Sequence, residues 1–489
     1  MPSCHTLIHN VQIADGSGSE PHPGSVAIEN DRIRAISDLH GYSAQQTFDG
    51  KGHVLAPGFI DAHTHDDLYM IRAPEMLPKL SQGVTTVIVG NCGISGSPVR
   101  LSGNFPDPMN LLGQEDEFRY PTFAEYAAAV TGARPTVNVA ALVGHTALRN
   151  NHMDRLDRAA TATEIAAMQE QLREALDQGA IGLSTGLAYL SAYSASVEEV
   201  EDLAEVLADS GALYTTHLRS EADQVLPALN EAFNIGRRAK APVIVSHLKC
   251  AGIDNWGRSG EVLESLGSAR RYQAVGCDCY PYAASSSTLD LRQVDERVTI
   301  FITWSKPHPE IAGTSLAEIA KTWQVSQLEA ARKLQPAGAI YHSISEDDMR
   351  AILRHPATMI GSDGLPNDPL PHPRLWGTFP RVLGRYSREL RLFPLQEAIR
   401  KMTSLPAETF RLRDRGRIRE GYYADLVLFD AETVRDTASF ADPVRPSTGI
   451  EAVWVNGVLS YRNGSCSGRR SGKFLSRKTE RQTELHMSS

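Results

Sequence analysis

Four histidines, one cysteine and one aspartate each lie at the end of a short apolar segment with the composition of a β-strand. These segments are rich in Val, Ile and Thr, the residues that favour strands. His63 and His65 are separated by one residue, so in an extended segment both side chains point to the same side and can chelate one divalent metal. The complete set is His63, His65, Cys92, His217, His247 and Asp363.

Each of these residues alone has an ordinary structural explanation, since a lone cysteine, for example, is most often a small buried thiol. Their coincidence at several strand ends does not have one. Imidazole, thiolate and carboxylate together suit zinc, which polarises a carbonyl oxygen and lowers the pKa of water to about 7. Amide hydrolysis needs both effects, and also a base that takes the proton of water and returns it to the amine. Asp363 is the candidate for this base.

The apolar segments alternate with helical segments, a pattern that predicts parallel βα units. One helix is expected to begin at Thr161, which has capping-box spacing to Glu164, and to stop at Gly179. Eight such units predict an α/β fold of the (β/α)8 TIM-like barrel type, with the site at the carboxyl ends of its strands. A doubly wound open sheet is the alternative. The strands are expected to end near Ile60, Val89, Val143, Leu183, Thr216, Ser246, Cys277 and Ile360.

Both ends of the chain have a different texture, with short alternating runs broken by Gly, Asn and Asp. We therefore expect residues 1–57 and 415–467 to form one small β-domain, and residues 58–414 to form the barrel. Residues 285–339 are too long for a plain βα loop and are expected to form a lid inserted over the site. Residues 468–489 are expected to be a flexible basic tail.

The composition favours a soluble enzyme that acts on a small molecule. The 489 residues carry a net charge of −9, so no overall basic field attracts nucleic acid or anionic lipid. The first twenty residues lack the features of a secretory signal, and no apolar run is long enough to cross a bilayer. Six cysteines in a chain of this length fit the reduced cytoplasm better than a disulfide framework. The oligomeric state is not indicated by the sequence.

The order of the candidate ligands, His-x-His first and aspartate last, resembles the amidohydrolase superfamily, whose split β-domain also matches the two chain ends. Within it, the chain resembles the D-aminoacylases, the N-acyl-D-amino-acid deacylases. The motifs that carry this resemblance span nearly the whole chain, at residues 57–65, 90–93, 142–145, 183–189, 246–249, 280–286 and 361–364.

The resemblance implies that Cys92, His217 and His247 hold one tightly bound zinc. It also implies that His63, His65 and Asp363 line a second, weaker position that is empty or partly filled. The residues alone allow either one or two metals. Many relatives bridge two metals through a carboxylated lysine on the fourth strand, but no lysine occurs between Gly179 and Tyr189, which disfavours that arrangement.

The resemblance also suggests which residues bind the substrate. Lys249, Tyr280 and Arg374 are expected to hold its α-carboxylate, with Ser286 beside them, although Arg374 has a solvated surface position as its ordinary alternative. Arg292 lies in a region where an arginine of relatives binds an acidic side chain. The resemblance therefore implies that the substrate is an N-acyl-D-glutamate or N-acyl-D-aspartate. The alternative is that Arg292 is one of the mixed exposed charges that a lid surface commonly carries, with no role in binding. The last two candidates, which either polarise the scissile carbonyl or pack near the barrel mouth, are His145 and Tyr189.

Two other functions compete with N-acyl-D-amino-acid hydrolysis. A cyclic amidase of the hydantoinase or dihydroorotase type would use the same scaffold, but Cys92 and the missing lysine count against it. A non-catalytic scaffold derived from a hydrolase could lose ligands freely, whereas this sequence retains the complete set. Cys250, Cys277 and Cys279 are interpreted as buried structural residues rather than further ligands.

Overall fold

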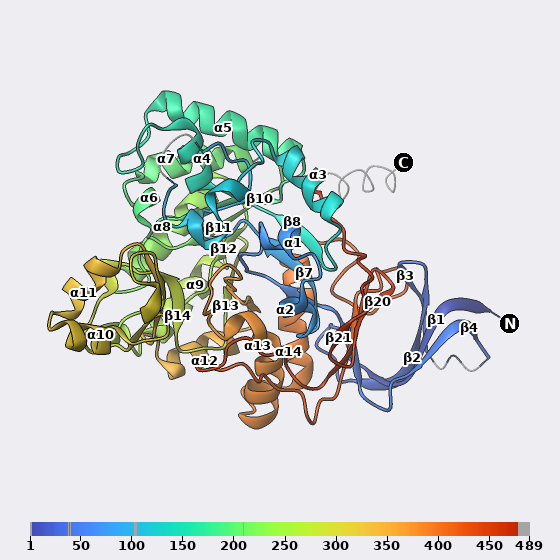
Figure 1. Ribbon diagram of the computed structural model, residues 1–489. Helices are drawn as coiled ribbons and strands as arrows, with labels where there is room; N and C mark the ends of the chain where they lie inside the picture. The colour runs from blue at the N-terminus through green and yellow to red at the C-terminus, as the bar shows by residue number, and fades with distance from the viewer. Residues whose placement is uncertain (1, 38, 40, 102–104, 209, 478–489) are drawn as a thin grey trace.

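A closed barrel of parallel strands forms the centre of the computed structural model, which describes residues 2–37, 39, 41–101, 105–208 and 210–477 (Figure 1). Two parallel sheets of three and six strands join, because Leu142 N donates to Val89 O at 3.0 Å and Ala62 N donates to Ile360 O at 3.3 Å. The barrel prediction is confirmed, and the open-sheet alternative is wrong. In barrel order the strands are β6 (Phe59–Asp61), β7 (Val84–Val89), β8 (Asn138–Ala141) with its continuation β9 (Val143–Gly144), β10 (Gly182–Gly186), β11 (Leu213–His217), β12 (Val243–Val245), β13 (Val275–Cys279) and β17 (Thr358–Ile360).

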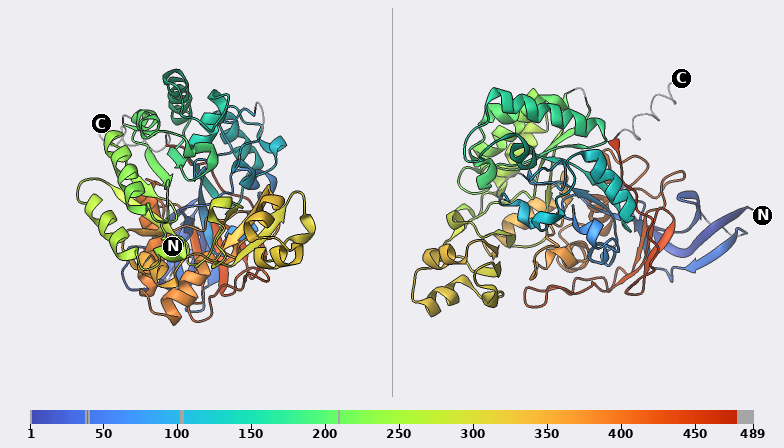
Figure 2. Two further views of the ribbon diagram at one scale, coloured as in Figure 1. Left: turned by 90° about the vertical axis from the view of Figure 1, so that its left-hand side faces the viewer. Right: turned by 45° about the horizontal axis from the view of Figure 1, so that its top comes forward.

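Helices surround this barrel, as the views in Figures 1 and 2 agree. The predicted capping box is present, since the Thr161 side chain accepts a hydrogen bond from Glu164 N at the start of α5. No helix in the described residues is long and apolar enough to cross a membrane. The helices are α1 (Tyr69–Arg72), α2 (Leu77–Leu80), α3 (Phe123–Ala133), α4 (His145–His152), α5 (Ala162–Asp177), α6 (Leu190–Tyr193), α7 (Val197–Ala204), α8 (Val225–Arg238), α9 (Ser259–Ala269), α10 (Leu316–Trp323), α11 (Gln327–Leu334), α12 (Glu346–Arg354), α13 (Arg374–Arg381), α14 (Leu395–Met402) and α15 (Ser404–Thr409).

The two chain ends share one nine-stranded sheet, and in Figure 1 the blue and red strands accordingly lie side by side. The ends meet where β5 pairs antiparallel with β18. Buried and less buried positions alternate along β1, as expected for a strand with one face on a core, and this core includes Ile8, Leu426 and Trp454. The strands are β1 (Ser3–Ile13), β2 (His22–Glu29), β3 (Arg32–Ser37), β4 (Ser43–Asp49), β5 (Val54–Pro57), β18 (Leu426–Phe429), β19 (Ile450–Val455), β20 (Val458–Arg462) and β21 (Ser465–Cys466).

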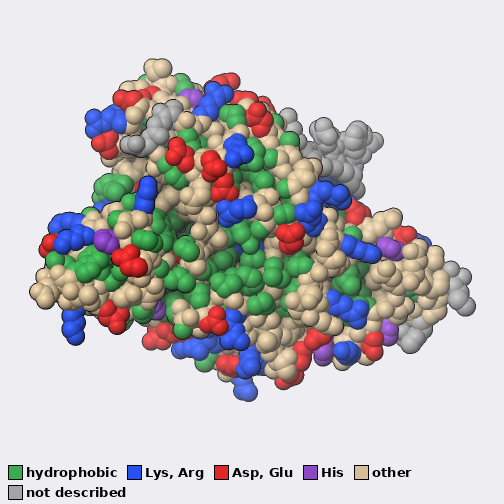
Figure 3. Space-filling view, in the orientation of Figure 1, with side chains coloured by type: hydrophobic (Ala, Val, Ile, Leu, Met, Phe, Trp, Pro, Cys, Tyr) green, Lys and Arg blue, Asp and Glu red, His purple; other side chains and the backbone are tan. Residues whose placement is uncertain are grey.

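The insertion between β13 and β17 forms a compact unit, which we call the lid unit, around residues 285–341. It consists of α10, α11 and a three-stranded antiparallel sheet of β14 (Ser285–Thr288), β16 (Ala337–Tyr341) and β15 (Ile300–Ser305). Its own apolar core includes Ile302, Leu316 and Leu334. Figure 2 shows that the lid unit projects from the barrel on the side away from the β-domain. On the face seen in Figure 3, hydrophobic side chains gather between these two units, and acidic and basic side chains are interspersed around them.

The expectation of a flexible tail from residue 468 is wrong for residues 471–477. Lys473 O accepts from Val139 N at 2.9 Å and Leu475 N donates to Val139 O at 2.7 Å, so this segment extends the pairing of β8. Its apolar residues explain the docking, because Phe474 packs on Phe123 and Leu475 is buried. Residues 478–489 lie outside the described residues.

Candidate metal centre and substrate cavity

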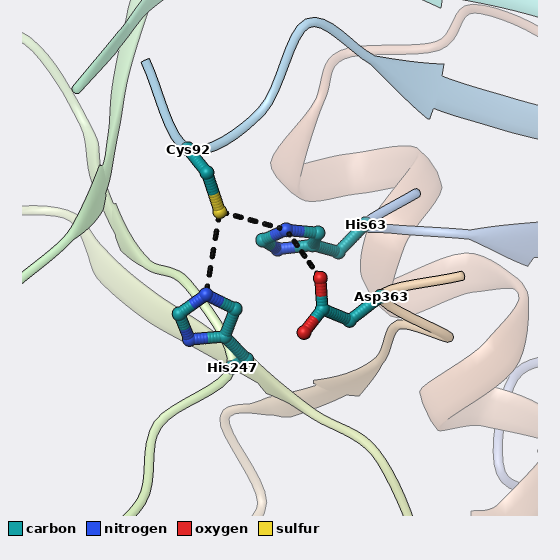
Figure 4. Close-up of side chains that lie close together, drawn as sticks. All are labelled: His63, Cys92, His247 and Asp363. Carbon is teal, nitrogen blue, oxygen red and sulfur yellow. Dashed lines mark hydrogen bonds and ion pairs between the residues drawn. The ribbon is translucent and has the colours of Figure 1, made fainter. Parts of the chain in front are cut away.

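Four buried side chains converge at the carboxyl ends of the barrel strands, as Figure 4 shows. His63 follows β6, Cys92 follows β7, His247 follows β12 and Asp363 follows β17. Their potential ligand atoms all lie within 4.8 Å of one another. Cys92 Sγ lies 3.3 Å from His63 Nε2 and 3.3 Å from His247 Nε2. This combination of thiolate, imidazole and carboxylate donors has the chemistry of a zinc site.

The surrounding charges favour the metal-binding forms of two of these donors. Burial by itself raises the pKa of the Cys92 thiol, but the imidazoles of His63 and His247 bring it well below its ordinary value. Burial likewise raises the pKa of the Asp363 carboxyl, and the guanidinium of Arg374 brings it well below its usual range. Arg374 Nη1 lies 2.8 Å from Asp363 Oδ2. The site therefore favours a thiolate and a carboxylate, which are the ligand forms of these residues.

Strained backbone conformations place three of the donors. Cys92, His247 and Asp363 have φ angles of 55°, 34° and 49°, in the left-handed region that costs about 1–3 kcal/mol for residues other than glycine. The turn that carries Cys92 also requires a glycine, because a Cβ at Gly90 would lie 2.3 Å from Leu142 O. Such strain persists where the surrounding structure holds it, and here it coincides with the candidate metal ligands.

The two remaining predicted ligands, His217 and His65, border this cluster. The His217 ring lies 4.5 Å from that of His247, and His65 Nε2 lies 3.2 Å from Asp363 Oδ1. Among the described residues, the buried Nδ1 atoms of His217 and His65 have no hydrogen-bond partner. Buried nitrogens are rarely left unpaired, so these lone pairs fit a metal ion. The structure thus brings all six predicted ligands together.

Two carboxylates at the centre were missed by the sequence analysis. Glu221 Oε1 lies 2.9 Å from His247 Nδ1 and 2.6 Å from Lys249 Nζ, and Glu221 Oε2 lies 3.6 Å from His217 Nε2. Asp278 Oδ2 lies 3.3 Å from His63 Nδ1. The available signals were an acid four residues after a candidate ligand and an acid directly after the predicted end of a strand at Cys277.

A buried charge network beneath the His-x-His segment was also missed. Lys79 Nζ lies 2.8 Å from Asp61 Oδ2 and 3.1 Å from Asp66 Oδ2, and all three side chains are fully buried. The same ammonium donates to Thr64 Oγ1 at 2.8 Å and to Ser362 Oγ at 3.0 Å. The network links the end of β6 to the end of β17, the two strands that present His63, His65 and Asp363.

A cavity of about 850 Å³ opens over this centre and extends under the lid unit. Its lining includes five of the predicted substrate-site residues, Tyr189, Lys249, Tyr280, Ser286 and Arg292, together with His217, His247 and Asp363. A separate cavity of about 520 Å³ is lined by residues at the amino ends of β10 and β11 and contains none of the candidate ligands. The larger cavity is therefore the candidate substrate site.

The residues expected to hold a carboxylate lie close together, with Lys249, Tyr280 and Ser286 in the lining of this cavity and Arg374 buried against Asp363. The Arg374 guanidinium lies 4.7 Å from the centre of the Tyr280 ring, and Lys249 Nζ lies 5.8 Å from the same ring. Arg374 is fully buried and its Nη2 donates to Ser286 O at 3.0 Å, which argues against the solvated alternative for this arginine. The Tyr280 hydroxyl and the Ser286 hydroxyl are buried and have no partner among the described residues. Two cations and two free hydroxyls are suitable for a substrate carboxylate.

The structure separates the two candidates for carbonyl polarisation. Tyr189 lines the cavity, and its ring lies 4.8 Å from that of His217. His145 does not line it: its Nε2 lies 3.0 Å from Glu199 Oε1, and Arg149 pairs with the same carboxylate. A carbonyl-polarising role for His145 is therefore not supported, because its described nitrogen contact belongs to a buried ion-pair network at the start of α4.

Arg292 lies at the cavity wall, where it is bound by the lid itself. Its Nε lies 3.0 Å from Asp290 Oδ1 and its Nη2 lies 2.7 Å from Asp290 Oδ2. Nη2 also donates to Ala188 O at 2.7 Å. The side chain remains 43% exposed. Asp290 thus offsets part of the Arg292 charge, and within the described part of the chain Nη1 of Arg292 has no hydrogen-bond partner.

Comparison with known proteins gives a consistent assignment. A model of the amidohydrolase family matches residues 46–461. The chain is 46% identical to a D-aminoacylase of Alcaligenes xylosoxydans xylosoxydans, over 96% of this chain and 97% of that protein. It is also 46% identical to an N-acyl-D-glutamate deacylase of the same organism, over 96% of each. A crystal structure of the N-acyl-D-glutamate deacylase of Bordetella bronchiseptica, complexed with zinc and a phosphonate inhibitor that mimics the tetrahedral intermediate, has a TM-score of 0.93 and 44% identity, over 97% of this chain and 100% of that one.

Proposed function

Because the chain belongs to the D-aminoacylases of the amidohydrolase family, we propose that it is a zinc-dependent enzyme that hydrolyses N-acyl-D-amino acids to a carboxylate and a free D-amino acid. The observation that carries this proposal is the convergence of Cys92, the histidines and Asp363 beside a cavity that Lys249 lines, with the buried guanidinium of Arg374 against Asp363. Family membership disfavours a cyclic amidase, and β10, with the sequence GLSTG, contains no lysine that could bridge two metals. The complete donor set disfavours a non-catalytic scaffold.

Zinc fits the donors, and Cys92, His217 and His247 would hold the tight position. His63, His65 and Asp363 line the adjacent weaker one. When bound, zinc supplies a Lewis acid that polarises the amide carbonyl and makes a nearby water more acidic. The unpaired Nδ1 atom of His217 and the favoured thiolate of Cys92 support this assignment.

Asp363 is the proposed general base and acid of the reaction. Its carboxyl is kept ionised by Arg374, so it can accept a proton from the attacking water and return that proton to the leaving amide nitrogen. Tyr189, beside His217, is placed to donate a hydrogen bond to the oxygen of the scissile carbonyl. The burial of Asp363 and His63 keeps bulk water away from the proton-transfer path.

Lys249, Tyr280, Ser286 and Arg374 form the proposed subsite for the α-carboxylate. Lys249, Tyr280 and Ser286 line the cavity, and the Arg374 guanidinium lies 4.7 Å from the centre of the Tyr280 ring. Fixing the carboxylate there orients the acyl amide toward Asp363. The proposed preference for the D form is supported by the relatives, which are a D-aminoacylase and an N-acyl-D-glutamate deacylase.

We assign Arg292 to the recognition of an acidic substrate side chain such as that of D-glutamate. The relative named for D-glutamate and the one named simply D-aminoacylase are equally similar to this chain, so overall identity does not separate acidic from neutral substrates. Arg292 can offer Nη1 to a carboxylate. Because Asp290 already binds Nε and Nη2 of the guanidinium, the preference for an acidic side chain is expected to be modest.

The proposed partner is the small-molecule substrate alone, with neither nucleic acid nor membrane involved, and the proposed location is the cytoplasm. The net charge of −9 and the free state of all six cysteines support this. The test is zinc analysis of the purified protein together with an assay of the D and L forms of N-acetyl-glutamate, N-acetyl-aspartate, N-acetyl-leucine and N-acetyl-methionine. We expect hydrolysis of the D forms only, with zinc bound. Retained zinc without hydrolysis of any of these compounds would refute the proposed substrate class.

A further inference from the structure

The cavity contains a carboxylate to which neither the metal nor the substrate assignment gives a role. Glu221 lies in the loop after β11, four residues beyond His217, and its side chain is only 14% exposed. Its two oxygens face three partners, His217 Nε2, His247 Nδ1 and Lys249 Nζ. Burying a carboxylate is costly unless it is paired, and here the pairing involves both histidines of the tight metal position.

The position of Lys249 argues against Glu221 being a metal ligand itself. Together with His217 and His247 it forms a group of donors close enough for an ion. The ammonium of Lys249 already lies there, however, 2.6 Å from Glu221 Oε1 and 2.8 Å from His247 Nδ1. A divalent ion between the same oxygens and nitrogens would meet that positive charge at contact distance.

The two histidines present opposite nitrogens to Glu221. For His247, Nε2 lies 3.3 Å from Cys92 Sγ and Nδ1 lies 2.9 Å from Glu221 Oε1. For His217, Nε2 lies 3.6 Å from Glu221 Oε2, whereas the buried Nδ1 has no partner among the described residues. A neutral imidazole carries one proton, and a carboxylate attracts that proton to the nitrogen it faces. Lys249 Nζ also lies 2.8 Å from His247 Nδ1, but an ammonium can only donate, and we assign its proton to the closer Glu221 Oε1 at 2.6 Å. Glu221 then accepts from His247 Nδ1 and faces His217 Nε2, which leaves the lone pair of His247 on Nε2 and that of His217 on Nδ1.

We propose that Glu221 is a positioning residue that spans the outer nitrogens of His217 and His247, fixes both tautomers, and so orients both imidazole ligands of the tight zinc. This rests on the proposed zinc site. Carboxylates behind metal-bound histidines raise the basicity of the ring and lock its orientation, and their loss lowers metal affinity about 10- to 100-fold. A single carboxylate that serves two ligands would act on both at once.

The test measures zinc retention rather than activity. Glu221→Gln keeps the size of the side chain and removes its charge, and Asp223→Asn makes the same change at an exposed position two residues away. The rate of zinc transfer from each holoprotein to a chromophoric chelator is followed at pH 7. We expect Glu221→Gln to lose zinc about 10- to 100-fold faster than the parent, and Asp223→Asn to stay within about twofold. Glu221→Asp, which retains a carboxylate, is expected to fall between Glu221→Gln and the parent.

Three results would overturn the proposal. The first is a rate of zinc loss in Glu221→Gln within about twofold of the parent, with both proteins folded by circular dichroism. The second is a lower zinc stoichiometry at saturation with unchanged loss of the remaining ion, which would make Glu221 a ligand of a separate metal. The third is equal acceleration in Glu221→Gln and Glu221→Asp, which would indicate that local packing alone is involved. Because zinc loss is measured without substrate, a failure of the proposed hydrolytic activity would be seen separately, in the assay of the parent.

Discussion

Substitution of the buried Lys79 by methionine should weaken the fold beneath the metal centre. The ammonium lies between Asp61 and Asp66 at 2.8 and 3.1 Å, and none of the three side chains is exposed. Methionine fills the aliphatic volume but leaves two buried carboxylates without a cation. Removing one partner from a buried ion pair costs about 3–5 kcal/mol, and we expect Lys79→Met to lower the free energy of unfolding by that amount.

The measurement is urea unfolding of the zinc-loaded protein, with Lys321→Met on the exposed face of α10 as the matched control. The control should remain within about 0.5 kcal/mol of the parent. The double variant Lys79→Met/Asp66→Asn removes a charge of each sign and should recover part of the loss, because the two effects are coupled. A free energy of unfolding for Lys79→Met within about 1 kcal/mol of the parent would refute the argument, since a buried cation would then contribute no more than a surface one.

Three further predictions follow from particular contacts. Arg292→Met should lower kcat/KM for N-acetyl-D-glutamate about fivefold, equivalent to about 1 kcal/mol, and change that for N-acetyl-D-methionine less than twofold; an equal effect on both would contradict the assignment of Arg292 to the side chain. Asp368 accepts a hydrogen bond from Thr303 of the lid unit, and burial raises the pKa of its carboxyl to about 7. Ionising this buried carboxyl destabilises the folded protein, so the destabilisation is absent below the unfolded pKa near 4 and complete above pH 7. Asp368→Asn should therefore match the parent near pH 4 and gain stability relative to it up to pH 8, by at most about 4 kcal/mol in urea titrations, and a difference that does not vary with pH would count against this. Gly90→Ala should lower the free energy of unfolding by about 2–4 kcal/mol because the new Cβ would meet Leu142 O. Gly257→Ala, also at positive φ but with open space around it, should cost about 1 kcal/mol. Equal melting temperatures for the two variants would contradict the steric argument.

The sequence predicted the barrel and the convergence of the candidate ligands because each parallel strand has a recognisable local sequence pattern. Each ligand follows an apolar run, and the carboxyl ends of parallel strands meet on one side of a barrel, so residues as far apart as His63 and Asp363 could be placed together without knowledge of their contacts. The capping box at Thr161 was readable for the same reason, since both of its partners lie within one turn of helix.

The supporting carboxylates and the docked tail could not be predicted in this way. Asp278 acquires its role from His63, which is 215 residues away in the chain, and no local pattern specifies that pairing. Lys79 likewise would be expected on the surface, and only the fold shows that it is enclosed by Asp61 and Asp66. In the tail, basic residues suggested solvation, but Phe474 and Leu475 supply enough apolar surface to hold the segment against β8.

Arg374 connects substrate binding to the strength of the proposed base. In the free protein its guanidinium contacts Asp363 and the backbone of Ser286 in the lid unit, and it holds the pKa of the Asp363 carboxyl well below its usual range. A carboxylate so stabilised is a weak base. When the α-carboxylate of a substrate pairs with Arg374, it offsets part of the positive charge that stabilises the ionised form of Asp363, and the pKa of Asp363 rises. Under the proposed assignment the base therefore strengthens when the substrate is in place, and the residue proposed to bind the substrate anion also prepares Asp363 to accept the proton.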